Sequence, residues 1–434
     1  LTNSTRLANS YEFANISAVP RLAITMGIGT ILKAKKIILM AWGPTKAPVI
    51  QQSVEGDDTE HVPASLLQNH DDVMFVIDEM AAAELTRYKS PWLTGECEWT
   101  EKMIKKAVVN MSLKLGKPVL SLTNTDYNEF GLGDLLVEKG DAYEINLQVY
   151  YMLRDSITGW PGGKPNAVIP NHPERSTPYP KKVILFSPHP DDDIISMGGT
   201  FQRLHDQGHE VHVAYQTTGN IAVADDEALR FAEFVVDFNE KFESPNAKAN
   251  RIYKEAIKFL RNKPDSEIDI PAVREIKGLI RKGEAKNTCR FVGIKKENAH
   301  FLELPFYETG TIRKKPIGEK DIQIVMDLIE EIQPHQIYAA GDLADPHGTH
   351  KVCLDAIMEA VTRLKHREYM KNCWVWLYKG AWAEWDIDQI EMAVPMSPDQ
   401  VFKKRMGIFK HQSQKDGVVF RETGFIALAR DQRR

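Results

Sequence analysis

Short runs of apolar residues recur along the chain and form two series. In the first series, KIILMAW (36–42) and VMFVI (73–77) have the length and residue types of buried strands, and a helix-like stretch over 46–55 separates them. Apolar residues at helical spacing follow over 99–115 and 144–154. This alternation predicts an α/β domain with a helical extension.

The second series begins after residue 180. KVILFS (182–187) and EVHVAY (210–215) are predicted strands, and a predicted helix over 194–207 joins them into a β-α-β unit. Two more strands and two more helices are predicted, over 336–340, 373–378, 321–332 and 351–364. We expect an open parallel sheet with helices on both faces, which binds ligands at the carboxyl ends of its strands.

Pro and Gly cluster between the two series, in GWPGGKPNAVIPNHPERSTPYP (159–180), where hydrophobic periodicity stops. The sequence thus predicts a domain over 1–160, a linker over 161–180 and a domain over 181–434. The expected fold class is α/β, with two Rossmann-like domains that have mainly parallel sheets, the first incomplete at its N-terminus. Because the chain opens on Leu1 without Met, we expect a fragment of a longer polypeptide.

Composition narrows the function classes. With 43% hydrophobic and 26% charged residues, the 434-residue chain has the composition of a globular protein. Its net charge of -5 offers no basic surface for nucleic acid. No apolar run approaches the roughly 20 residues of a membrane span. The four cysteines are scattered, without a Cys-x-x-Cys pair, so we expect reduced thiols, no disulfide framework and a cytoplasmic location; they are Cys97, Cys289, Cys353 and Cys373.

Two polar clusters directly follow predicted strands of the second domain. PHPDDD (188–193) supplies His189 and Asp192, and DPHGTH (345–350) supplies His347 and His350. Two histidines and one carboxylate are a recurrent ligand set of catalytic zinc, which keeps a position for water. Each cluster alone also fits a structural role, such as capping the helix that follows. Their joint occurrence at one edge of a sheet favours a metal site, for Zn²⁺ or for another divalent ion such as Fe(II), Co(II) or Mn(II).

The motifs also resemble those of a known family. The stretch PHPDDDIISMGGTFQRLHDQGHEVHVAYQTTGN (188–220) resembles the opening of the LmbE-like or PIG-L family of zinc-dependent N-acetylglucosamine deacetylases. Further on, RKGE (281–284) is similar to the Arg-x-x-Glu helix of that family, DPHGTH to its second histidine motif and HQSQ (411–414) to its near-terminal motif. The resemblance covers roughly residues 180–434.

The resemblance implies a role for each matching residue. His189, Asp192 and His350 would be the metal ligands, Asp191 the general base, and His347 would face the reacting carbonyl. In this chemistry the metal lowers the pKa of its bound water toward about 7 and polarises the amide oxygen, while the base transfers the proton to the leaving amine. A protonated His347 would stabilise the tetrahedral oxyanion.

Arg281 is a further candidate, for binding the sugar or a neighbouring anionic group; a solvated position on a helix face is the alternative. Two positions depart from the family pattern, because Asp193 stands where Glu is common and Thr349 where many members have Asp. The segment over 221–271 is longer than expected. It is interpreted either as a lid or substrate-shaping insertion, or as a surface excursion.

The first 87 residues resemble another family. LTNSTRLANS, VPRLAITMGIGTILKAKKIILMAWGPTKA, SVEG and PASLLQNH follow one another as in the C-terminal part of glucosamine-6-phosphate deaminases. That resemblance implies contacts of Arg6 and Lys46 with a sugar phosphate. The catalytic machinery of that family lies earlier than Leu1, so the residues here are not expected to deaminate. The longer protein carries that machinery, or this half serves packing or oligomerisation.

The leading hypothesis is metal-dependent hydrolysis of the N-acetyl amide of an N-acetylglucosamine derivative. The expected substrate is an N-acetylated aminosugar or an aminosugar phosphate, and a homo-oligomer is compatible with the pattern. One alternative is a glucosamine-6-phosphate deaminase or isomerase. Another is a catalytically weak sugar-binding or assembly module, which would bind no metal or would bind metal without turnover.

Overall fold

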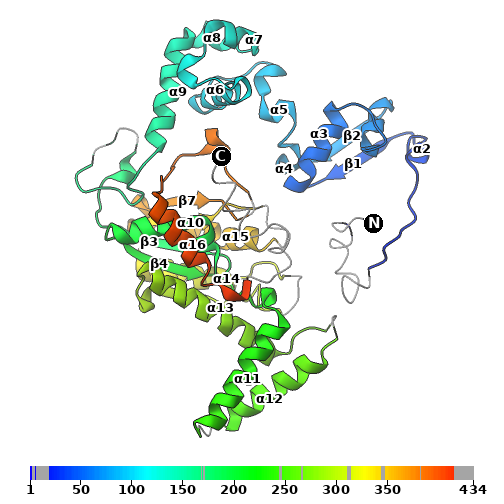
Figure 1. Ribbon diagram of the computed structural model, residues 1–434. Helices are drawn as coiled ribbons and strands as arrows, with labels where there is room; N and C mark the ends of the chain where they lie inside the picture. The colour runs from blue at the N-terminus through cyan, green and yellow to red at the C-terminus, as the bar shows by residue number, and fades with distance from the viewer. Residues whose placement is uncertain are drawn as a thin grey trace. The chain divides into compact units, whose positions relative to one another are not determined.

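The protein is described here from a computed structural model, which describes residues 1, 5, 19–167, 169, 172–243, 247–264, 267–309, 314–343, 348–381 and 383–414 (Figure 1). The chain divides into two compact units. The five-stranded unit takes in Leu1–Pro20, Thr158–Glu384 and Val394–Arg434, and the two-stranded unit takes in Arg21–Ile157 and Trp385–Ala393. The mixed α/β architecture with parallel sheets confirms the predicted fold class. The domain bounds given above stay a prediction.

A parallel sheet with strand order β5-β4-β3-β6-β7 forms the centre of the five-stranded unit. Its strands are β3 (Lys182–Ser187), β4 (Glu210–Tyr215), β5 (Ala299–Phe301), β6 (Gln336–Ala340) and β7 (Trp374–Tyr378). The central strand β3 is buried on both faces, with Val183 and Leu185 in one core and Ile184 and Phe186 in the other. Burial on both faces explains why KVILFS is an uninterrupted apolar run.

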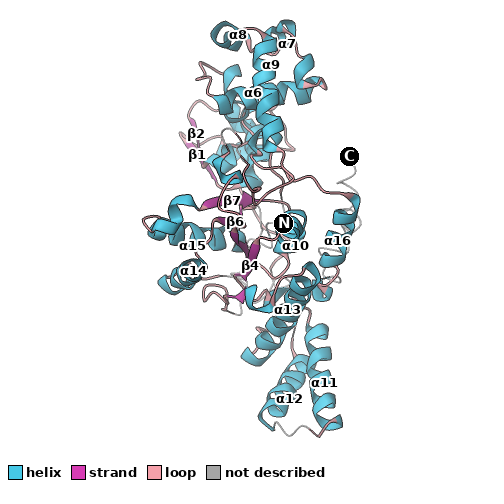
Figure 2. Cartoon of the chain, turned by 90° about the vertical axis from the view of Figure 1, so that its left-hand side faces the viewer, coloured by secondary structure: helices cyan, strands magenta, loops and turns pink. Residues whose placement is uncertain are grey.

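Helices cover both faces of this sheet, as Figure 2 shows. On one face lie α10 (Asp192–Asp206), α13 (Pro271–Val292) and α16 (Pro398–Ile408). On the other face lie α14 (Glu319–Ile332) and α15 (Thr349–Leu364). The predicted helices of the second domain correspond to α10, α14 and α15. Because β3 and β6 are parallel, the loops that follow them open at the same edge of the sheet.

The long segment over 221–271 folds into a helical hairpin. It consists of α11 (Asp225–Lys241) and α12 (Ala247–Asn262), which project away from the sheet (Figure 1). The hairpin packs on α13 through a small apolar cluster. Two lysines and two aspartates add four ion pairs of 2.5–2.9 Å, namely Lys263–Asp225, Lys263–Asp269, Lys277–Asp225 and Lys277–Asp269. The helices α11 and α12 therefore form an arm that is fixed at its base.

The two-stranded unit contains the parallel pair β1 (Ile37–Ala41) and β2 (Val73–Ile77). The helix α3 (Ala47–Glu55) connects the two strands. One face of this sheet is open, because Ile38 and Met40 are 55% and 59% exposed. The sequence predicted buried strands here, whereas the structure shows β1 buried at Ile37 and Ala41 and β2 only partly buried.

Four helices of this unit build a separate core around Trp92, Val108 and Tyr127; they are α6 (Glu101–Leu115), α7 (Asn124–Glu129), α8 (Gly133–Lys139) and α9 (Ala142–Ser156). The short helices of the unit contribute no residue to this core; they are α2 (Ile28–Ile31), α4 (Glu79–Ala82) and α5 (Thr86–Lys89). The helices α6 and α9 correspond to the helical spacing predicted over 99–115 and 144–154. Among the described residues, every helix is too short or too polar to cross a bilayer.

Candidate metal centre

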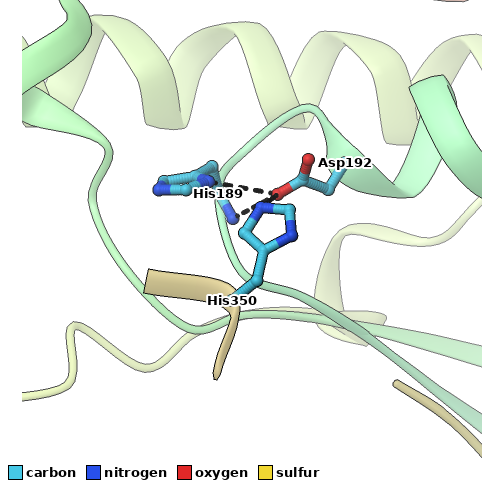
Figure 3. A group of neighbouring side chains, drawn as sticks. All are labelled: His189, Asp192 and His350. Atoms are coloured by element: carbon cyan, nitrogen blue, oxygen red, sulfur yellow. Dashed lines mark hydrogen bonds and ion pairs between the residues drawn. The ribbon is translucent and has the colours of Figure 1, made fainter. Parts of the chain in front are cut away.

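Three side chains that follow β3 and β6 converge at the carboxyl edge of the five-stranded sheet. His189 lies in the turn after β3, Asp192 is the first residue of α10, and His350 lies in the first turn of α15, after β6. Their ligand atoms all lie within 4.8 Å of one another (Figure 3). Asp192 Oδ2 lies 3.2 Å from His189 Nδ1 and 3.2 Å from His350 Nε2. The structure thus brings together the three residues that the sequence predicts as metal ligands.

The hydrogen bonding of His350 fits a cation at this point. Its Nδ1 lies 3.1 Å from the backbone carbonyl oxygen of Asp342, so a neutral ring carries its proton on Nδ1 and donates it to that carbonyl. Nε2 then directs a lone pair toward Asp192 Oδ2, which is also an acceptor. A divalent cation between the two atoms turns this repulsion into ligation. Metal-bound histidines commonly donate their other ring N–H to a carbonyl or carboxylate, so the donor set fits zinc.

Asp192 is held in the charge state that a ligand needs. The residue is 4% exposed. Burial alone would raise the pKa of its carboxyl, but the imidazoles of His350 and His189 hold that pKa below its ordinary value. The backbone N–H of His189 also donates to Asp192 Oδ2 at 2.9 Å. A positive charge beside Asp192, on an imidazole or on a bound cation, therefore favours its ionised form.

The neighbouring Asp191 has a different partner. Its Oδ1 lies 2.9 Å from Nη2 of Arg281, which reaches the loop from α13 and is 1% exposed. Arg281 Nε and Nη1 are also buried, and among the described residues no group accepts a hydrogen bond from them. The ion pair orients the Asp191 carboxylate beside the three ligands while leaving it outside the ligand set. The predicted base and the predicted sugar-binding arginine are thus partners of each other.

Hydrogen bonds between α13 and the HQSQ segment (411–414) stabilise the position of this ion pair. Glu284, one turn after Arg281 on α13, accepts hydrogen bonds from the backbone N–H and the hydroxyl of Ser413, both at 2.7 Å. His411 Nε2 lies 2.9 Å from the hydroxyl oxygen of Thr288, and burial lowers the pKa of His411 to about 4. The HQSQ segment therefore fastens α13, the helix that carries Arg281.

Asp193 has a packing role. Its carboxylate is fully buried and accepts a hydrogen bond of 2.9 Å from the Tyr215 hydroxyl on β4, while its backbone N–H donates to the hydroxyl of Ser187 at 3.0 Å. Burial raises the pKa of Asp193 to about 7. The short side chain that departs from the family pattern thus links α10 to β3 and β4.

Two predicted site residues lie outside the described residues. His347 falls in 344–347 and Arg6 in 6–18. Thr349, the other departure from the family pattern, begins α15. Its hydroxyl is buried and, in the described part of the chain, has no hydrogen-bond partner.

Lys46 lies in the two-stranded unit. It is exposed and ends a short 3-10 turn after β1. That turn begins at Gly43, which has a φ of 85° that favours glycine. The Gly43 N–H donates to both carboxylate oxygens of Asp78 after β2, at 3.0 and 3.1 Å. The loop that carries Lys46 is therefore fixed to the end of the neighbouring strand.

The sequence analysis missed a pocket beside the candidate centre. The pocket has a volume of about 200 Å³. Its wall includes Pro190, which links His189 to Asp191, together with Thr218, Asn220, Arg274, Lys282 and Glu308. The signal for it in the sequence was the pair Thr218–Gly219 after β4, which belongs to the stretch 188–220 and lies at the same sheet edge as the candidate metal ligands.

Different parts of the chain match different groups of known proteins. Residues 184–361 match the sequence profile of the PIG-L family, described as GlcNAc-PI de-N-acetylase. The chain carries a PIG-L-type domain. All three converging residues lie inside the matched range, and the resemblance of 188–220 to this family is confirmed.

Relatives match the rest of the chain as well. Over 423 residues it is 51% identical to a protein of Bacteroides thetaiotaomicron named as glucosamine-6-phosphate deaminase-like, over 97% of this chain and 64% of that protein. Over 87 residues it is 55% identical to the glucosamine-6-phosphate deaminase of Latilactobacillus sakei, over 20% of this chain and 37% of that enzyme. The chain thus spans less than two thirds of the length of these relatives. The resemblance of the first 87 residues to deaminases is confirmed.

Among solved structures, the chain is similar to an N,N'-diacetylchitobiose deacetylase from Pyrococcus horikoshii. The TM-score is 0.34 and the identity 18%, over 56% of this chain and 73% of that chain.

Proposed function

We propose that the PIG-L-type domain hydrolyses the N-acetyl amide of an N-acetylglucosamine derivative in a metal-dependent reaction. The observation that carries this proposal is the convergence of His189, Asp192 and His350 beside a carboxylate, Asp191, that is not a ligand. Amide hydrolysis needs an electrophilic centre for the carbonyl oxygen and a nearby base for water, and this arrangement offers both.

The chain's own residues divide the work as follows. Zinc, when bound by His189, Asp192 and His350, supplies Lewis-acid polarisation of the amide carbonyl and lowers the pKa of water. Asp191 accepts the proton of the attacking water and delivers it to the nitrogen of the leaving amine. Arg281 fixes the position of the Asp191 carboxylate through their ion pair. His347 is assigned to the developing oxyanion, the role that the family resemblance implies.

The deaminase-like region supports an aminosugar substrate. The 87-residue match to a glucosamine-6-phosphate deaminase supports a second aminosugar-related region in the same polypeptide. For the whole protein, a second candidate activity is therefore deamination of glucosamine 6-phosphate, with Arg6 and Lys46 contacting the phosphate. The two reactions would remove acetate and then ammonia from one sugar.

The test is acetate release from a panel of N-acetylglucosamine compounds by the zinc-loaded chain. Asp191→Asn should lower kcat by about 10²- to 10⁴-fold and keep stoichiometric zinc, because it removes the base but leaves the ligands. The matched control Asp206→Asn changes an exposed aspartate at the end of α10 and should leave the rate unchanged.

His350→Ala should lose zinc and activity together. Zinc that binds without any acetate release would favour the sugar-binding module over the enzyme. Full activity in Asp191→Asn would remove the assignment of the base. Reconstitution with Fe(II), Co(II) and Mn(II), followed by the same assay, ranks the metals.

A further inference from the structure

The pocket beside the candidate centre is small and has a charged wall. Its volume of about 200 Å³ lies below the range of roughly 300–1,000 Å³ that is typical of sites for drug-sized ligands. The pocket can therefore hold one compact group, whereas a lipid tail or an oligosaccharide is larger than its volume. Pro190 forms part of its wall, so the pocket adjoins the turn that carries the metal ligands and Asp191.

Arg274 is the cation in this wall that lacks a carboxylate partner. Among the described residues, no acidic oxygen lies within the 4.0 Å of an ion pair with its guanidinium. Its Nη1 has a long contact of 3.5 Å with the backbone oxygen of Glu308. Its Nε is buried and has no acceptor in the described part of the chain. A buried N–H donor without an acceptor is costly, and a ligand that supplies the acceptor removes the cost.

The carboxylates of the pocket have other partners. Glu303 pairs with Lys282 at 3.1 Å. Glu308 accepts hydrogen bonds from two neutral donors, the Thr218 hydroxyl at 2.8 Å and the Asn220 amide at 3.1 Å. Burial raises the pKa of Glu308, and both of its carboxylate oxygens are already engaged by these two donors. Glu275 is exposed to solvent, so its charge is screened.

We propose that the pocket binds a compact oxyanion, a phosphate or a carboxylate, carried by the N-acetylated sugar, and that Arg274 is the residue that recognises it. The planar guanidinium matches the oxygen geometry of such groups and binds them with two parallel hydrogen bonds. This inference rests on the proposed deacetylase function and narrows its substrate to an anionic aminosugar derivative.

The geometry of α13 supports this assignment. Arg274 and Arg281 are seven residues apart, which places them on one face of the helix and about 10 Å apart along its axis. Arg281 contacts Asp191 at the reaction centre, so Arg274 lies about one phosphorylated sugar away from it. Gly278, between the two on the same helix, also lines the pocket.

The experiment compares anionic and neutral substrates on the zinc-loaded full chain. The substrates are N-acetylglucosamine, its 6-phosphate, its 1-phosphate and N-acetylmuramic acid, whose anion is a carboxylate. The variants are Arg274→Gln and Arg274→Lys. The matched control is Arg290→Gln, an exposed arginine on the same helix that bonds to Asn287. The unfolding midpoint of each variant, compared with that of the parent chain, shows whether it is folded.

An anionic substrate should have a KM about tenfold to a hundredfold lower than N-acetylglucosamine. Arg274→Gln should raise the KM for that substrate to the KM of the neutral sugar. Arg274→Lys should restore part of the difference, and Arg290→Gln should change nothing. The preferred compound identifies phosphate or carboxylate as the anion. Equal KM values for neutral and anionic sugars, or a preference that survives in Arg274→Gln, would overturn the proposal.

A binding measurement separates this inference from the proposed function. Calorimetry with inorganic phosphate, on the parent chain and on Arg274→Gln, needs no turnover. Phosphate binding that weakens at least tenfold in Arg274→Gln supports the subsite even if no substrate releases acetate. Identical phosphate binding by the two proteins refutes the subsite even if the chain proves to be an active deacetylase.

Discussion

The two units of this chain both build a parallel sheet, but they differ in what covers the sheet and in what gathers at its carboxyl edge. In the five-stranded unit, helices bury β3 on both faces, and the loops after β3 and β6 bring three metal-ligand atoms within 4.8 Å. In the two-stranded unit, one face is open, with Met40 59% exposed, and the loops after β1 and β2 are joined through Gly43 and Asp78.

This contrast shows how a site acquires rigidity. A ligand set must hold its geometry before the substrate arrives, and elements fixed between two packed layers provide that geometry. The turn from β3 to α10 starts and ends in elements that are buried in a common core. The turn after β1 starts from a strand with one solvent-facing side. The first edge suits a catalytic centre, and the second suits a contact with a soluble, charged group.

The largest change in the free energy of unfolding is expected from a pair of matched isoleucine substitutions, one in each sheet. Ile184 of β3 is 0% exposed and Ile38 of β1 is 55% exposed. Ile184→Ala should lower the free energy of unfolding of its unit by about 2–5 kcal/mol, because it leaves a cavity in a packed core. Ile38→Ala should change that of its own unit by less than about 0.5 kcal/mol.

Native-state hydrogen exchange with mass spectrometry measures both effects in the intact chain, through the amides of β3 and β1. Comparable losses for the two variants would show that the open face of β1 is covered in solution.

The convergence of the three candidate metal ligands could be predicted from the sequence because it follows from local spacing and from the order of parallel strands. His189 and Asp192 lie in one turn, and His350 follows a neighbouring strand, so the parallel topology alone brings them to one edge. The open face of β1 could not be predicted in this way. An apolar run such as KIILM indicates a strand, but the neighbours that cover its two faces come from the tertiary fold.

The pocket that contains Arg274 could not be predicted from the sequence either, because it also depends on the tertiary fold. Arg274 lies on α13, Glu308 lies in the loop after β5, and Thr218 follows β4. No motif joins these three residues, and only the packing of α13 against the sheet brings them together. The pairing of Arg281 with Asp191 likewise depends on where α13 lies, although both residues belong to recognised motifs.

Acid is expected to affect the five-stranded unit through a buried histidine. His209 is 6% exposed, and its Nδ1 accepts a hydrogen bond of 3.0 Å from the backbone N–H of Lys181. Burial, with the nearby charge of Lys181, lowers the pKa of His209 to about 4. An unfolded histidine has a pKa of about 6.5. Between these two values the unfolded chain binds the proton and the folded chain does not, so stability falls as the pH decreases from about 6.5 to about 4.

The loss attributable to His209 should be about 2 kcal/mol after allowance for solvent screening. His209→Gln keeps an acceptor for the Lys181 N–H but does not titrate, so its unfolding midpoint should fall less between pH 7 and pH 5 than that of the parent chain. His70→Gln is the control, because His70 accepts a backbone N–H from Asp72 at a partly exposed position of the two-stranded unit. An equal acid shift in parent and His209→Gln would assign the acid sensitivity to other groups.

The smallest effect is expected at Lys46, at the carboxyl edge of the open sheet. Lys46 is exposed and occupies the N-cap of α3, where its positive charge opposes the helix dipole. The contact with a sugar phosphate proposed above would give a lysine at this position a function that the fold does not. Lys46→Gln should therefore stabilise its unit slightly, by about 0.3 kcal/mol, and leave acetate release within about twofold of the parent. Hydrogen exchange over α3 and the acetate assay measure these two quantities. A loss of stability would show that Lys46 serves the fold, and a large loss of acetate release would contradict the assignment of Lys46 to the deaminase-like region alone.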